Sequence, residues 1–167
     1  MNDNIQLLKY MLEDVREVTM KGVSHLSKEQ LFAEPVKGEY PIGAYLMHLA
    51  ECEIYWLEVI SGNAQPEELK KRAYANVWYD PYETSVPPET APEITEYKEV
   101  LDLARKNFLD YVLTLKDSEL AENVTVKRER GDIQFSKKWI IYHIIEHEAH
   151  HRGQMFMLMR MAGMNKK

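Results

Sequence analysis

Histidine is the residue type in this sequence whose number and spacing point most directly to chemistry. Among six histidines, His147 and His151 stand four positions apart near the C-terminus, and His48 lies far earlier in the chain. Residues four positions apart on an α-helix lie one above the other on the same face, so two such imidazoles can ligate one metal ion together. A third histidine on a facing helix would complete a set of three nitrogen ligands.

Helical periodicity places these histidines on the apolar faces of their helices. His147 and His151 share a face with apolar neighbours, which are Ile140, Ile144, Met155 and Leu158. His48 shares a face with a similar group, which is Tyr45, Cys52, Trp56 and Val59. Burying three imidazoles without partners costs several kcal/mol, and a divalent ion would supply the partner.

Other polar residues near these positions have competing interpretations. Cys52 lies one turn from His48, where it is either a soft fourth ligand or buried packing. Glu51 is a candidate to orient a ligand or a bound water, or else a solvated helix acid. Gln154 is a candidate to donate to bound water or to a facing backbone group. His143 and His150 lie off the centre of the core face and are expected outside the ligand set, and His25 is expected at the surface.

Four long helices must position these residues. Apolar periodicity predicts them at about 5–23, 41–60, 93–115 and 136–162. In the first helix the apolar period includes Val18 on the inner face and leaves Arg16 among the polar residues between. Pro41 suits the first turn of the second helix, Gly163 suits a left-handed cap after the last, and Ser27 with Gln30 predicts a short capped turn.

The segments between the long helices are predicted from their composition. Residues 64–92 contain five prolines among several aromatic residues, which predicts a long connection crossing the bundle, with a short helix at 66–73. Residues 124–126 and 133–135 predict a small β-hairpin or an extended loop before the last helix. The expected fold is all-α, a four-helix bundle with one long crossover connection.

Length and composition narrow the function classes. The 167 residues suit a single domain spanning 1–167, and 45% hydrophobic content is enough to form a core. A formal charge of −6 with scattered lysines and arginines disfavours nucleic-acid binding. No run approaches the roughly 18 apolar residues that span a bilayer, so no membrane association is expected. A single cysteine and no signal-type N-terminus favour a cytoplasmic protein.

The segments HLAECEIYWL (48–57) and HIIEHEAHHRGQMFMLMRMAG (143–163) resemble the DinB/YfiT-like family of bacterial metal-binding four-helix bundles. The resemblance covers the second and last helices closely and the other two by length and order. The family's metal ligands, one histidine on the second helix and an H-x-x-x-H pair on the last, fall on His48, His147 and His151. The resemblance implies one divalent ion, nickel or zinc, in a homodimer. Some relatives are S-transferases that use bacillithiol, mycothiol or glutathione.

Two functions remain open from the sequence. In the first, the ion lowers the pKa of a bound thiol or water, and the protein is a metal-dependent transferase or hydrolase with a small-molecule substrate. In the second, the ion ties two helices together in a non-catalytic, stress-related protein. Structural zinc sites usually have four protein ligands, so a Cys52 thiolate in the site would favour the second function and a bound water the first.

Overall fold

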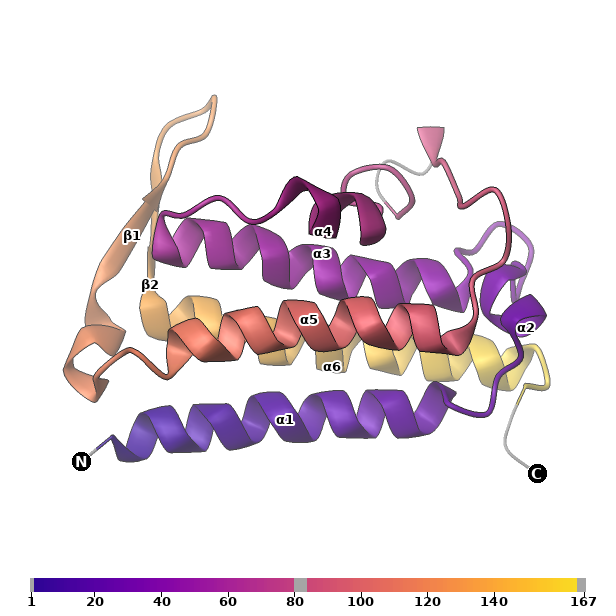
Figure 1. The fold of residues 1–167 in the computed structure, drawn as a ribbon, viewed down its shortest axis with the longest axis horizontal. Helices are drawn as coiled ribbons and strands as arrows, with labels where there is room; N and C mark the ends of the chain where they lie inside the picture. Colours follow the sequence, from indigo (N-terminus) through magenta and orange to yellow (C-terminus); the bar gives the residue numbers. More distant parts are fainter. Residues whose placement is uncertain (1, 80–83, 165–167) are drawn as a thin grey trace.

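The computed structural model describes residues 2–79 and 84–164, and it is mostly helical with one small hairpin. Four long helices pack along one another, which are α1 (Asp3–Val23), α3 (Ile42–Ser61), α5 (Ile94–Val112) and α6 (Lys137–Met161) (Figure 1). The all-α prediction is confirmed, and the helix bounds differ from the predicted ones by at most three residues. Within the described residues, no helix is both long and apolar enough to cross a membrane.

The direction of each long helix follows from the connections. Figure 1 shows α1 and α6 running one way along the bundle, while α3 and α5 run the other way. The connection after α3 returns along the outside of that helix before α5 begins, so α3 and α5 are parallel neighbours. The helices α3 and α6 are antiparallel neighbours, which brings the middle of one against the middle of the other.

Local capping signals set several helix ends, and the predicted cap of Ser27 with Gln30 is confirmed. The hydroxyl of Ser27 accepts the backbone N–H of Gln30, and the Gln30 side chain accepts the N–H of Ser27, which caps the short helix α2 (Lys28–Phe32). The helix α3 is capped at its C-terminal end by Gly62, whose φ of +71° is a conformation that glycine adopts without strain. The Ser136 hydroxyl accepts the N–H of Trp139 and caps the start of α6.

The connection between α3 and α5 contains the predicted short helix, α4 (Glu67–Arg72). Pro81 and Tyr82, which belong to the predicted proline-rich and aromatic connection, lie outside the described residues. Trp78 is buried, with 2% of its surface exposed, and its ring packs against Phe32, Tyr74 and Tyr97. This indole therefore anchors residues 74–78 of the connection to the bundle.

A two-stranded hairpin precedes α6, as predicted. Strand β1 (Asn123–Val126) pairs antiparallel with β2 (Ile133–Ser136), and Asn123 lies opposite Ser136. Figure 1 shows the hairpin projecting from one end of the bundle. A short 3-10 helix, η2 (Asp117–Ala121), lies before it and was not predicted, because five residues are too few for an apolar period to show.

The helical phase predicted for α1 is wrong at two positions. The apolar pattern placed Val18 inward and Arg16 outward, whereas Val18 is 41% exposed and Arg16 is 6% exposed. The reason is that the Arg16 guanidinium forms ion pairs with two buried carboxylates, which stabilise its charge inside the bundle.

Candidate metal centre

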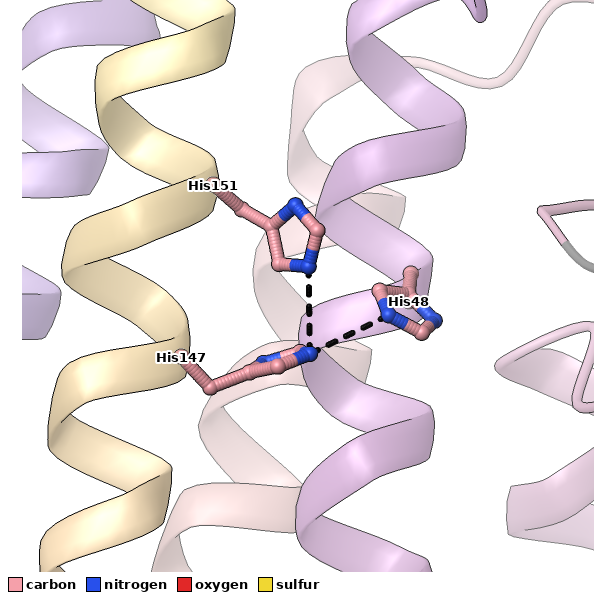
Figure 2. A group of neighbouring side chains, drawn as sticks. All are labelled: His48, His147 and His151. Atoms are coloured by element: carbon pink, nitrogen blue, oxygen red, sulfur yellow. Dashed lines mark hydrogen bonds between the residues drawn. The ribbon is translucent and has the colours of Figure 1, made fainter.

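Three imidazoles converge between α3 and α6, near the middle of the bundle (Figure 2). The Nε2 atom of His147 lies 3.2 Å from Nε2 of His48 and 3.1 Å from Nε2 of His151. Within the described residues, no other group of three histidine, cysteine or acidic side chains brings its ligand atoms this close together. The structure thus brings together the three residues that the sequence selected as ligands.

Hydrogen bonds to the far side of two rings fix the role of each nitrogen. The Nδ1 atom of His48 lies 3.1 Å from Oε2 of Glu51, and Nδ1 of His151 lies 2.7 Å from Oε1 of Gln154. Both oxygens accept hydrogen bonds, so each Nδ1 carries the proton and donates it. The Nε2 atoms of these two rings therefore present lone pairs to the centre of the cluster.

The donor set fits one divalent ion. First-row metals bind imidazole nitrogen at about 2.0–2.1 Å, which sets neighbouring ligand nitrogens about 2.8–3.4 Å apart, with octahedral geometry at the lower end and tetrahedral geometry at the upper end. The two Nε2 separations at His147, 3.2 and 3.1 Å, fall in this interval. Neutral nitrogens at such distances repel one another through their lone pairs unless a cation or proton lies between them. A divalent ion would relieve this repulsion at all three nitrogens.

The environment keeps the imidazoles of His147 and His151 neutral, which is the form that ligates metals. Burial, together with the neighbouring His151 and His48, lowers the pKa of His147 to about 2. Burial likewise lowers the pKa of His151 to about 4. A proton therefore competes weakly for these two nitrogens at neutral pH.

Three tyrosines cover one side of the cluster. The Tyr79 ring stacks on the His48 ring with centroids 4.0 Å apart, and Tyr40 stacks on Tyr79 at 4.5 Å. The rings of Tyr45 and Tyr79 lie 5.7 and 5.6 Å from that of His151. Tyr79 of the long connection, together with Tyr45 of α3 and Tyr40 just before it, thus limits access of water from that side.

The two other histidines of α6 lie beside the cluster. The His143 ring stacks on Trp139 at 4.9 Å, and its centroid is 5.6 Å from that of His147. His150 is exposed, with its ring centroid 5.2 Å from that of His151. Neither ring contributes a nitrogen to the converging group, as expected from the helical phase.

Cys52 is buried packing and contributes no ligand atom to the converging group. Burial raises the pKa of its thiol well above the usual range, and the neighbouring Glu53 carboxylate raises it further.

His25 differs from the surface residue that was predicted, because it is partly buried and its Nε2 atom lies 2.8 Å from the carbonyl oxygen of Met164. This contact holds the end of α1 to the chain after α6.

A sequence profile described as the DinB superfamily matches residues 11–155. The chain belongs to the DinB superfamily. It is 26% identical over 141 residues to the uncharacterised protein YizA of Bacillus subtilis (strain 168), and the match covers 84% of this chain and 77% of that protein. The fold is similar to the crystal structure of a conserved protein from Enterococcus faecalis, with a TM-score of 0.76 at 12% identity, covering 96% and 97% of the two chains.

One buried group in this DinB-superfamily chain was missed from the sequence. Glu53 of α3 and Glu148 of α6 are each 1% exposed, and they pair with Arg16 of α1 and Arg105 of α5. Each of the four long helices thus contributes one charge to a quartet of zero net charge. Because α3 and α6 also carry the histidines, the quartet fixes how these two helices face each other.

A signal for this quartet was present in α3. That helix is apolar on nearly every side, and a helix of this kind lies in the middle of a fold. An acid such as Glu53 in a central helix must meet a partner, since a buried carboxylate is otherwise too costly. The partners could not be named, because Arg16 and Arg105 occupy ordinary polar positions in amphipathic helices.

Proposed function

We propose that this protein binds one divalent metal ion, zinc or nickel, through Nε2 of His48, His147 and His151, and uses it to make a small thiol or water reactive at neutral pH. The observation that carries the proposal is the convergence of three Nε2 atoms, two of them on rings whose Nδ1 protons are held by oxygen acceptors. This combination of ligand and partner is typical of histidines that ligate metals.

An open ligand set favours a catalytic role over a purely structural one. Structural zinc sites close with four protein ligands, whereas catalytic sites keep three and leave a position for substrate. Among the described residues, the converging group has three members, and Cys52 is not one of them. When bound, the ion would lower the pKa of a thiol or water that reaches it.

The surrounding residues would support this chemistry. Glu51 and Gln154 hold the Nδ1 protons and keep the rings of His48 and His151 aimed inward. Tyr79 and Tyr45 exclude water from one side of the ligands, which strengthens electrostatic interactions inside the site. Three neutral imidazoles leave the double charge of the ion uncompensated, so an anionic thiolate is favoured as the next ligand.

Cobalt-substituted protein provides the test of a thiol substrate. Titration with glutathione or bacillithiol at millimolar concentration should produce a sulfur-to-cobalt charge-transfer absorption, and the His147→Ala variant should not show it. A thiol-conjugation assay with an aryl halide, run with and without chelator, should then show metal-dependent turnover. A cobalt protein whose spectrum does not respond to thiols would refute the transferase and leave a hydrolase or a non-catalytic metal protein.

We also propose that the chain forms a homodimer, as the resemblance implies. Large apolar side chains remain exposed on two neighbouring long helices, α1 and α6, and they include Leu7, Met11, Met157 and Met161. Burying such side chains between two copies would be favourable. Sedimentation at micromolar concentration should show a dimer, and a monomer alone would contradict the proposal.

A further inference from the structure

The carboxylate of Glu51 is shared between the histidine cluster and the connection that follows α4. Its Oε2 atom accepts the hydrogen bond from Nδ1 of His48 at 3.1 Å, and its Oε1 atom accepts the backbone N–H of Asn76 at 2.5 Å. The Glu51 side chain is only 14% exposed, so water competes weakly for either oxygen. One side chain therefore joins a ligand to the segment that lies over it.

The backbone at Asn76 is held in an unusual conformation. Tyr74 and Asn76 have φ angles of +51° and +60°, in the left-handed region that residues other than glycine seldom adopt. An asparagine tolerates this region, but a tyrosine is strained there. Such conformations persist only where surrounding contacts hold them, and the bond from Asn76 to Glu51 is one of these contacts.

The same segment makes a second contact with the same histidine. Tyr79 stacks on the His48 ring with an angle of 16° between the ring planes, and Trp78 beside it is anchored in the core. The His48 imidazole thus meets residues 74–79 in two ways, at its Nδ1 through Glu51 and at its face through Tyr79. A change in the charge or position of this imidazole will therefore alter the contacts that residues 74–79 make.

We propose that Glu51 is a positioning residue that couples metal binding at His48 to the conformation of residues 74–79. This rests on the proposed function, because it requires an ion at Nε2 of His48. An ion on Nε2 makes the Nδ1–H a stronger donor and so fixes the Glu51 carboxylate in place. A carboxylate already fixed offers its second oxygen to Asn76 at a smaller loss of conformational entropy.

Coupling of this kind acts in both directions. If a bound ion favours the ordered conformation of residues 74–79 by a given factor, that conformation raises the affinity for the ion by the same factor. Glu51 would then tighten metal binding and close the tyrosine cover, with Tyr79 over His48, in one event. The substrate would meet an ordered site only in the metal-bound protein.

Hydrogen exchange at the Asn76 amide, with and without zinc, tests the coupling. In the wild-type protein zinc should slow this exchange roughly tenfold, the effect of stabilising one hydrogen bond to a charged acceptor. In Glu51→Gln the zinc effect should disappear, because the His48 and Asn76 donors meet different oxygens of Glu51, and the glutamine replaces one of these acceptors with an NH2 donor. Zinc affinity, measured by competition with a chelator, should fall about 10–100-fold in the same variant.

Glu58→Gln is the matched control. Glu58 lies two turns further along α3, and its Oε1 accepts the backbone N–H of Gln65 at 2.7 Å, from the same connection. It forms its ion pair with Lys70 and contacts no ligand of the cluster. This variant should therefore keep both the zinc affinity and the zinc-dependent protection of Asn76.

The outcomes separate this inference from the proposed function. Zinc bound at one ion per chain without any change in Asn76 exchange would overturn the coupling and leave the metal centre in place. A wild-type protein that binds no zinc would overturn both. Zinc-dependent protection that survives in Glu51→Gln would show that Glu51 is not the link. The wild-type comparison alone decides the coupling if Glu51→Gln does not fold.

Discussion

Replacing Glu148 by glutamine perturbs the buried charge quartet while conserving its volume. The Glu148 carboxylate accepts N–H groups of Arg16 at 3.0 and 3.2 Å and of Arg105 at 2.6 Å. Without its charge, two guanidiniums share the single carboxylate of Glu53, and the amide NH2 of the new glutamine faces further donors. Removing one partner from a buried ion pair costs about 3–5 kcal/mol, a large part of the stability of an ordinary domain.

Urea unfolding of metal-free protein, followed by circular dichroism, measures this cost without a contribution from bound metal. Glu146→Gln is the control on the same helix, because its side chain is 49% exposed, and its effect should stay below about 0.5 kcal/mol. Adding Arg105→Met to Glu148→Gln restores a neutral pair of Arg16 and Glu53. The double variant should therefore lose less stability than the sum of the single variants.

The reasoning also predicts how the stability cost of Glu148→Gln changes with pH. Burial raises the pKa of Glu148, but Arg16 and Arg105 outweigh burial and hold the pKa below its usual value. Its stabilising contribution is present above the ordinary carboxyl pKa and is lost as pH falls through the lowered one, so the cost of Glu148→Gln should shrink in acid. A cost below about 1 kcal/mol at pH 7 would refute this reasoning. It would show that the arginines relax toward solvent through the groove they line between α1 and α5.

Further predictions concern the histidines and the glycines. Because burial and neighbouring histidines lower the pKa of His147 and His151, nitrogen NMR of metal-free protein should show both rings neutral from pH 7 to about 5; titration near 6.5 would contradict this. Unfolded histidines bind protons near that pH, so stability should fall as pH drops below it. Gly43→Ala should cost about 1–3 kcal/mol in thermal unfolding, since its Cβ would meet Tyr97 Oη at 2.3 Å. Gly153→Ala, with no atom within 4 Å, should add about 0.5–1 kcal/mol; the reverse order of effects would contradict both predictions.

Much of the fold could be predicted from local patterns. The caps at Ser27 and Ser136 and the glycine at 62 act within a few residues of themselves, so the sequence alone reveals them. The hairpin at 123–136 and the short helix after Pro66 follow equally from local composition. The inward phase of His147 and His151 was readable because apolar residues surround them at helical spacing.

The interactions that could not be predicted join residues far apart in the chain. Arg16 and Glu148 meet only because α1 packs beside α6, and no periodicity in either helix reports that pairing. The contact of Asn76 with Glu51 depends on a left-handed turn in a segment without regular structure. Glu51 was selected as a candidate to orient a ligand or a bound water, and it meets Nδ1 of His48. Gln154 was selected as a donor to bound water or to backbone, whereas its Oε1 atom accepts from Nδ1 of His151.

Metal content after reconstitution with zinc and exhaustive dialysis tests the central claim most directly. The wild-type protein should retain one ion per chain. Single alanine variants of His48, His147 and His151 should each retain less than about a tenth of it, since losing one of three ligands costs several kcal/mol of binding. His150→Ala, one residue from a ligand but exposed, should retain the full amount. Loss of zinc from His150→Ala with retention in His151→Ala would contradict the account, as would a wild-type protein that holds no ion.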